Sequence, residues 1–534
     1  MQQNKVGEPK LFKLFGHFSL VLLLGVSTLN AESFADFKRS QAKSFQNYKD
    51  ERDNAFKKYL TDQWKAYNVF KGTPLYEKPK PKKIPLAKPK KVQIAGPKIS
   101  IKVKPVKHVE LKPVQKIVLI DKPVHVAPKP IKKVKKPKVK KPEAKKPTVV
   151  KPPVVVEIPQ KVEPKPVVKV VKKDISFNFY GSKLAFDIPN GIKNANYYPQ
   201  SQKGITNFFD SAASSEYEYL ISEITRVKES MNLNDWGTYL LVLKISDTVF
   251  SSQDDSRLLS WFIFNKLGYS VKVGLAKKHI VLMHYSDKII YSTPSYTFSN
   301  KKFYVVANYN KGSVGRLFSY KQEYPGSTKA MDLDMRTLPN FSSDMKSKEL
   351  SFKEQGKTYK VDFEYNKNLI DFMATYPQAD YEAFFNTPLD ERTYQDIAKD
   401  LKKYIDGKRA SEAMNFVLHF VQKSFKYQRD DQQFGREKVM FAQETLYFDK
   451  SDCEDRAILY SYLMKELFGV AVVGVKYSDH MATALYVPMS GDSVNRGNRK
   501  FVVADPTYIN ASIGQSMPQY RSIQPESFVL VTKK

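Results

Sequence analysis

The sequence predicts an α+β protein of several domains, and three observations carry this prediction. At 534 residues the chain is too long for a single hydrophobic core. From Asp174 onward, segments with helical periodicity mix with short, β-branched runs. The part before Asp174 has a different composition, because a patterned helix and a long Lys/Pro-rich stretch precede the globular sequence.

Residues 1–31 are predicted to be a signal peptide or a membrane anchor. Three lysines precede an apolar run from Phe18 to Leu29, and Ala31 offers a small residue for cleavage. The run is shorter than the roughly 20 residues that a membrane span needs. Because Leu29 fits the −3 position poorly, a retained inner-membrane anchor is the alternative. Either way, we expect the rest of the chain in the periplasm or cell envelope.

Residues 32–72 are predicted to form one amphipathic helix. Its aromatic residues recur in two series at eleven-residue spacing: Phe34, Phe45, Phe56 and Tyr67, then Phe37, Tyr48, Tyr59 and Phe70. Eleven residues make three helical turns, so both series keep to one stripe. The stripe indicates self-association, for example as a coiled coil, or docking on a partner or membrane surface. The alternative is that it packs on a domain of the same chain.

Residues 73–173 are predicted to be a disordered, proline-rich linker. Between Glu77 and Lys173 lie 30 lysines, six acidic residues and 18 of the 31 prolines, so most of the net charge of +33 belongs here. Proline lacks a backbone donor and lysines repel one another, which favours an extended strut. The linker is either a plain spacer or one that also binds envelope polyanions. Nucleic acid is not an expected partner, because the chain carries an export signal.

Residues 174–360 are predicted to form an α+β domain. The expected helix covers residues 256–268, and the expected strands cover residues 238–245, 269–276, 278–285 and 288–294.

Residues 361–534 are predicted to form a second globular domain, which is more helical in its first half. The expected helices cover residues 365–376, 393–407, 410–427 and 453–468, and the expected strands cover residues 470–477, 480–487, 500–508 and 527–532.

The single cysteine of the chain, Cys453, is predicted to lie in the first turn of a helix. Ser451 and Asp452 are N-cap residue types, and Gly469 ends the apolar-periodic run. Backbone N–H groups at a helix start favour a thiolate and can stabilise an oxyanion beside it. The two acidic residues that follow the cysteine oppose the thiolate. A lone thiol in an extracytoplasmic chain is either buried and inert or present for its reactivity.

Two further side chains in the last domain fit the same chemistry. His480 opens a strand directly after a turn, where a side chain can face a cleft, whereas His419 lies in an apolar helix and is expected to be a core or boundary residue. Asp505 ends an apolar strand, and a carboxylate in that position can hold an imidazole in one tautomer.

Cysteine at a helix start, histidine at a strand start and Asp-Pro-Thr after the next strand resemble the transglutaminase-like superfamily. The likeness covers roughly residues 405–515. It implies a papain-like core, in which a helix packs on an antiparallel sheet. It also implies that Cys453 is the nucleophile, His480 the general base and acid, and Asp505 the group that orients the histidine.

The sequence departs from the pattern of the superfamily in two respects. Met-Ala-Thr follows the histidine where an Ala-Trp is frequent, and all three tryptophans lie outside this segment. Hydrolysis is therefore favoured over protein cross-linking. Gln443, ten residues before the cysteine, is the candidate oxyanion donor, since papain-like sites often place a glutamine there.

These residues predict an exported cysteine hydrolase or acyltransferase that acts on amide bonds of proteins or wall peptides through a thioester. The alternative is a non-catalytic envelope scaffold or binding protein with a vestigial Cys-His-Asp triad, in which the cysteine merely packs. Neither a cofactor nor a metal is expected, because the sequence contains no HExxH, CxxC, Walker or GxGxxG motif.

A segment of the middle domain is similar in sequence pattern to the cysteine region. Residues 251–285 and 450–487 both run from an acidic lead through an arginine, an apolar helix and a valine-rich strand to a histidine before another strand. His279 would correspond to His480, but the earlier copy has no cysteine. It is interpreted either as a degenerate transglutaminase-like domain, for example a platform for substrate recognition, or as a chance likeness of common units.

Overall fold

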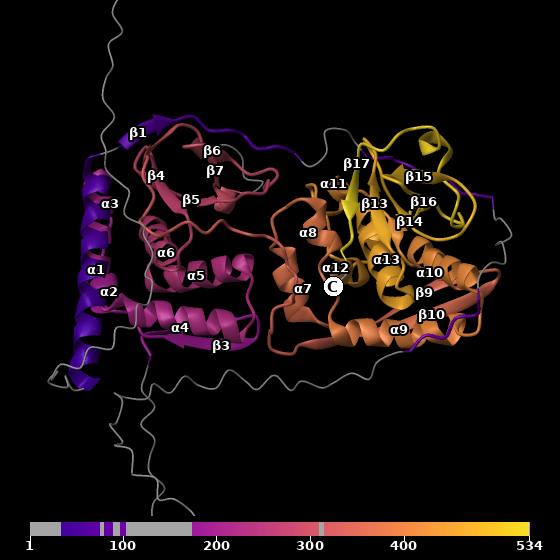
Figure 1. Ribbon diagram of the computed structural model, residues 1–534, viewed down its shortest axis with the longest axis horizontal. Helices are drawn as coiled ribbons and strands as arrows, with labels where there is room; N and C mark the ends of the chain where they lie inside the picture. Colours follow the sequence, from indigo (N-terminus) through magenta and orange to yellow (C-terminus); the bar gives the residue numbers. More distant parts are fainter. Residues whose placement is uncertain are drawn as a thin grey trace, which may run out of the picture. The chain divides into compact units, whose positions relative to one another are not determined.

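The computed structural model describes residues 34–62, 64–74, 80–88, 97–102, 173–308 and 314–532, and the chain is mixed α+β with antiparallel sheets (Figure 1). It divides at Ala55 into two units, and the second unit holds both large sheets. The predicted signal or anchor, residues 1–31, lies outside the described residues. Among the helices that are described, none has both the length and the apolar character needed to cross a membrane.

The N-terminal helix is shorter than predicted. Helix α1 covers Phe34–Asp62, and strand β1, Trp64–Tyr67, follows it and pairs antiparallel with β8, Leu317–Tyr320. The helical prediction to residue 72 is therefore wrong, because the edge of a sheet supplies backbone partners beyond Asp62.

Phe56, in the last part of α1, is fully buried. Its ring packs edge-on against Phe209, Tyr320 and Tyr324 of the same unit. For this part of the aromatic stripe, packing on the protein's own domain is confirmed.

The middle region, residues 173–344, combines a helical layer with a six-stranded sheet. Helices α5 and α6 contact each other, and α6 also packs on β4 and β5. The elements are β2 Ile175–Phe179, β3 Ser182–Phe186, α2 Asn190–Lys193, α3 Gln202–Ala213, α4 Tyr217–Ser230, α5 Asp235–Val249, α6 Gln253–Lys266, β4 Val271–Ala276, β5 His279–Tyr285, β6 Ser295–Phe298, β7 Lys301–Tyr304, η1 Val306–Asn308 and β8.

Two strand predictions in this region are wrong. Residues 238–245 lie inside α5, which the Asn234 side chain caps by accepting a hydrogen bond from the Gly237 N–H at 3.0 Å. A helix that is buried on most sides has no clear apolar period, so its sequence looks like a buried strand. Residues 288–294 form no strand, and β6 begins at Ser295.

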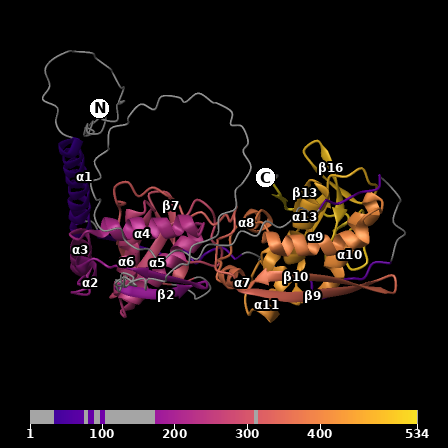
Figure 2. The same ribbon diagram turned by 90° about the horizontal axis from the view of Figure 1, so that it is seen from below.

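The C-terminal region begins earlier than residue 361. Strands β9, Met345–Glu354, and β10, Lys357–Asn366, form a hairpin whose turn has Gln355 and Gly356 at positive φ. The predicted boundary at residue 360 falls inside β10. In Figure 2 the hairpin lies along α9, Glu391–Ile405, and α10, Ala410–Ser424, which pack on it.

The remaining C-terminal elements surround a second, five-stranded sheet, and α13 packs on its strands β13 and β14 (Figure 1). They are α7 Lys367–Ala374, α8 Tyr381–Phe385, β11 Lys426–Tyr427, α11 Asp430–Gln433, α12 Ala442–Tyr447, β12 Lys450–Ser451, α13 Cys453–Phe468, β13 Val472–Lys476, β14 Met481–Leu485, β15 Ser493–Arg496, β16 Arg499–Ala504, η2 Pro518–Tyr520 and β17 Ser527–Leu530.

The two large sheets share one order of strands. The C-terminal sheet runs β15-β16-β14-β13-β17, and the middle sheet runs β6-β7-β5-β4-β8 with β1 added at its edge. When the strands are numbered from the helix that packs on the sheet, both sheets have the spatial order 3-4-2-1-5. Every pairing among these strands is antiparallel. The likeness therefore extends beyond the helix and two strands that the sequence indicates.

Two pieces of the predicted linker are ordered against the C-terminal region. Residues 97–102 are held by backbone hydrogen bonds, such as the one from the Ile99 N–H to the Lys408 carbonyl at 3.1 Å. In residues 80–88, the Ala87 N–H donates to the Ile509 carbonyl at 2.9 Å. The prediction of a disordered linker is wrong for these pieces, because the folded region supplies partners that composition does not reveal. Residues 75–79, 89–96 and 103–172 lie outside the described residues.

Candidate functional site

Cys453 is the first residue of α13, as predicted, and its side chain is fully buried. The helix starts there because the Asp452 N–H donates to Oδ2 of Asp455 at 3.1 Å, and it ends at Gly469, whose φ of 65° is left-handed. The buried Arg456, one turn along, ties this helix start to α10 by donating to the Phe425 carbonyl at 2.8 Å.

His480 and Asp505 form a buried pair, with 2.8 Å between Nε2 and Oδ2. They meet because β14, which follows His480, pairs with β16, which precedes Asp505. The other carboxylate oxygen, Oδ1, accepts the N–H groups of Thr507 at 2.9 Å and Tyr508 at 3.3 Å. This carboxylate is therefore fixed in position and holds the ring of His480 in a defined orientation.

Two residues that the sequence did not single out support this pair. The Tyr520 ring stacks on His480 with centroids 4.8 Å apart, and its hydroxyl donates to Asp479 at 3.0 Å. Gln422, on α10, donates to the Asp505 carbonyl at 2.9 Å. Both contacts join segments that are far apart in the sequence, so no local signal could have identified them.

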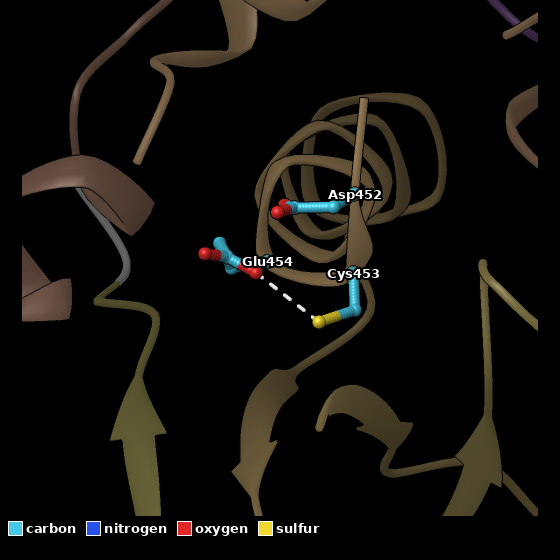
Figure 3. A group of neighbouring side chains, drawn as sticks. All are labelled: Asp452, Cys453 and Glu454. Atoms are coloured by element: carbon cyan, nitrogen blue, oxygen red, sulfur yellow. Dashed lines mark hydrogen bonds between the residues drawn. The ribbon is translucent and has the colours of Figure 1, made fainter. Parts of the chain in front are cut away.

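The thiol of Cys453 is not hydrogen-bonded to His480. Its Sγ donates to Oε2 of Glu454 at 3.1 Å, and Figure 3 shows the two groups turned toward each other. In the described part of the chain, Nδ1 of His480 is buried without a hydrogen-bond partner. The structure thus joins His480 to Asp505 and leaves Cys453 on the helix that packs beside them.

Burial raises the pKa of the Cys453 thiol well above its ordinary value, and the nearby Glu454 and Asp452 raise it further. The prediction that the helix start favours a thiolate is wrong for this arrangement, because desolvation and two carboxylates outweigh the backbone N–H groups.

A lysine from the predicted linker enters this acidic surrounding. The ammonium of Lys80, whose side chain is 2% exposed, lies 2.5 Å from Asp452, 3.1 Å from Asp430 and 3.2 Å from Glu437, and it also contacts Glu454. Glu454 thus bridges the ammonium through Oε1 and the thiol through Oε2. Sequence reasoning missed Lys80 because nothing local distinguishes it from the other linker lysines.

The carboxylates around the thiol are close enough to hold a cation. Burial raises the pKa of Asp430 and of Asp452, and an acidic neighbour raises each further, Asp452 for the former and Glu454 for the latter. Three residue sets place ligand atoms within 4.8 Å of one another: Asp452, Cys453 and Glu454; Asp430, Asp452 and Asp455; and Asp430, Glu437 and Glu454. The Lys80 ammonium supplies positive charge at this cluster.

Gln443 does not contact the cysteine through its amide. Its Oε1 accepts the Asp390 N–H at 3.1 Å, and its Nε2 donates to Oγ1 of Thr393 at 2.9 Å. Both ends of the amide are used at the start of α9, so these contacts do not support the oxyanion role, which stays a prediction.

Comparison with known proteins gives no further guide. The chain matches no protein-family model, no curated protein and no solved structure. The interpretation of the site therefore depends on its residues and their geometry.

The middle region has a related arrangement without a cysteine. Aligning Arg257 with Arg456 puts Asp254 at the position of Cys453, and Nδ1 of His279 lies 3.1 Å from Oδ2 of Asp254. Val305 directly follows β7, which is the position that Asp505 occupies after β16. A cavity of about 530 Å³ lies beside these residues. The region keeps the helix, sheet and histidine positions but lacks two of the three triad groups.

Proposed function

We propose that the C-terminal region is a transglutaminase-like cysteine hydrolase or acyltransferase that acts on amide bonds of proteins or wall peptides. The observation that carries the proposal is the buried His480–Asp505 pair, with Nδ1 of the histidine unpartnered, beside the helix that begins with the only cysteine. A packed helix on an antiparallel sheet supports a papain-like core.

The reaction uses these groups in sequence. With the Nε2–H of His480 donated to Asp505, Nδ1 carries the lone pair that accepts the thiol proton once Cys453 turns away from Glu454. The sulfur attacks the amide carbon, the C–N bond breaks, and His480 returns the proton to the leaving amine. Water or a second amine then resolves the thioester and regenerates the thiol.

The alternative is a non-catalytic envelope scaffold with a vestigial triad. The Cys453–Glu454 hydrogen bond and the raised pKa of the thiol favour it, because both disfavour the thiolate. The middle region fits either function as a diverged duplicate without a nucleophile, supported by its shared strand order.

The N-terminal third suggests where the protein works. We propose export to the periplasm or envelope, with attachment through residues 1–31 if they are retained. The linker lysines would bind envelope polyanions, and the exposed Phe45 and Tyr48 of α1 are available for self-association.

Alkylation of the single cysteine tests the catalytic proposal without knowledge of the substrate. Iodoacetamide labelling is followed by intact mass in the wild type and in His480→Ala. Both chains are also tested with Lys80→Ala, because Lys80 contacts Glu454, the carboxylate that accepts the thiol hydrogen bond. We expect His480→Ala to slow labelling near pH 7 at least tenfold. Unfolded samples control for intrinsic reactivity, and equal, slow labelling in all folded chains would support the scaffold.

A second experiment seeks the substrate. The wild type is mixed with cell-envelope extract, denatured in acid and analysed for a mass adduct on Cys453. Cys453→Ser is the control, since an ester in place of a thioester would form far more slowly. An adduct that survives in Cys453→Ala would refute the role assigned to the cysteine.

A further inference from the structure

Lys80 is buried more completely than its sequence context explains. It comes from a lysine- and proline-rich segment, yet its side chain is 2% exposed and its ammonium contacts four carboxylates. The neighbouring Lys82 and Lys83 are exposed. Within the described residues 80–88, one lysine therefore enters the acidic cluster, while Lys82, Lys83 and Lys88 stay exposed.

The carboxylates around Lys80 favour a cation. Asp430, Asp452 and Glu454 are buried, and Glu437 borders them. Oδ1 of Asp452 is buried without a hydrogen-bond partner in the described chain, so acceptor capacity remains. Removal of the ammonium would leave buried carboxylates facing one another, which is strongly unfavourable. A positively charged group is therefore the occupant that best balances these carboxylates.

The other cations around the pocket have partners of their own. Arg429 pairs with Asp431, Lys438 with Glu444, and Arg456 donates to Ser451 and to carbonyl groups of α10 and Phe425. None of these contacts joins a second cation to the four carboxylates.

Few hydrogen bonds hold the backbone of the described segment 80–88. The Tyr427 hydroxyl donates to the Pro81 carbonyl at 3.1 Å, Arg429 donates to the Lys80 carbonyl at 3.5 Å, and Ala87 is bonded as described above. Pro81 and Pro85 cannot donate hydrogen bonds. A segment with so few ladder bonds can be displaced without unfolding a sheet.

We infer that the pocket formed by Asp430, Glu437, Asp452 and Glu454 is a specificity subsite for the lysine-type side chain of a peptide substrate, and that Lys80 occupies it as an internal competitor. The inference rests on the proposed function, since the carboxylate of Glu454 contacts both the bound ammonium and the thiol of the proposed nucleophile. An ammonium held by several carboxylates stays protonated and is not a nucleophile, so the pocket recognises the substrate and does not supply the acyl acceptor.

Binding is tested in full-length chains that carry Cys453→Ala, so that turnover plays no part. The probes are acetyl-Ala-Lys-Ala-amide and its norleucine counterpart, measured by calorimetry. We expect Lys80→Ala to strengthen binding of the lysine peptide at least tenfold, and Asp430→Asn to reverse this gain. Lys82→Ala, which changes an exposed lysine of the same segment, should have no effect. The norleucine peptide should bind at least tenfold more weakly.

Equal binding of the two peptides, or binding of neither by a folded Lys80→Ala chain, would overturn the inference. Binding of calcium without binding of the lysine peptide would do so as well, and would identify the cluster as a metal site. Because Cys453 is absent from these chains, such results leave the triad untested, whereas failure of the alkylation experiment leaves peptide binding unaffected.

A second measurement covers the case in which Lys80→Ala does not fold. In the wild type, acetylation of Lys80 by acetic anhydride is followed by peptide mass spectrometry. Excess lysine peptide should expose Lys80 and raise its acetylation several-fold, relative to Lys82, while the norleucine peptide should not. Unchanged acetylation with a saturating lysine peptide would contradict the competition.

Discussion

Nε2 of His480 lies 2.8 Å from Oδ2 of Asp505, and both side chains are buried. The second oxygen of Asp505 accepts two backbone N–H groups. The carboxylate is therefore an acceptor at both oxygens, which requires the histidine to present a donor at Nε2 and leaves the lone pair on Nδ1.

Asp505→Asn should separate the electronic role of this carboxylate from its structural role. The amide oxygen can still accept the Thr507 and Tyr508 N–H groups, so the melting temperature should change little. The amide nitrogen would face Nε2 and force the proton to Nδ1, which removes the base. We expect turnover to fall by about 10²–10⁴-fold. Unchanged turnover in a folded variant would contradict the assignment.

Tyr520→Leu should lower turnover more than Tyr520→Phe. The leucine removes the ring that stacks on His480 at 4.8 Å, whereas phenylalanine keeps it and loses only the hydrogen bond to Asp479. Stacked pairs contribute about 0.5–1.5 kcal/mol, so a loss of about twofold to tenfold is expected for the leucine variant. Equal rates in both variants would show that the ring does not position the histidine.

Arg456→Met should destabilise the C-terminal region. The buried guanidinium donates to Ser451 and to the carbonyls of Gln422 and Phe425, and methionine leaves these acceptors without a donor. We expect a loss of about 2–4 kcal/mol in the free energy of unfolding. Arg521→Met removes an exposed pair with Asp492 and serves as the control, with a change below about 0.5 kcal/mol in urea titration.

Glu354 should make stability depend on pH in the acidic range. Burial alone would raise the pKa of its carboxyl, but hydrogen bonds from His419 and Lys423 outweigh burial and lower the pKa to about 2. The stabilisation is therefore present above the ordinary pKa near 4.5 and is lost as pH falls from there toward about 2. With allowance for solvent screening, we expect a loss of about 1–2 kcal/mol.

Urea titration at pH 5 and at pH 3 measures this loss. Glu354→Gln should reduce the difference between the two values, because the group that titrates is gone. Glu349 lies on the same strand as Glu354 and forms an exposed ion pair with Lys360 of β10, so Glu349→Gln should leave the difference unchanged. A pH slope that Glu354→Gln does not alter would rule out this carboxyl as its source.

Two aromatic residues of α1 should differ sharply in their effect on stability. Phe56 is fully buried among other rings, so Phe56→Ala should cost about 3–5 kcal/mol. Phe45 is 63% exposed, and Phe45→Ala should leave thermal unfolding unchanged. If the stripe also drives self-association, sedimentation should show a lower mass for Phe45→Ala, and an unchanged monomeric mass in both chains would exclude it.

Local signals predicted the elements that depend on them. The start and end of α13 follow from Asp452 and Gly469, and the hairpin of β13 and β14 follows from the two apolar runs on either side of His480. Strand β15 was missed because Ser493–Arg496 lacks apolar alternation, and its pairing depends on the sheet beside it. Propensity gives no account of such tertiary support.

The candidate site was predictable only in part, and for the same reason. The His480–Asp505 pair follows from the ends of adjacent strands, which the sequence reveals. The hydrogen bond from Cys453 to Glu454 forms between buried neighbours, and the entry of Lys80 joins segments several hundred residues apart. Carboxylates surround the thiol and disfavour the thiolate that the sequence predicts.

The chain on either side of Lys80 is anchored, at Phe70 by its pairing with Ser295 and at Lys98 by its pairing with Arg409. A ligand tethered in this way has an effective concentration in the millimolar range, however dilute the protein is. A dissolved amine at micromolar levels would compete poorly with it. A polymer that presents many lysines at one surface raises their local concentration and would compete better.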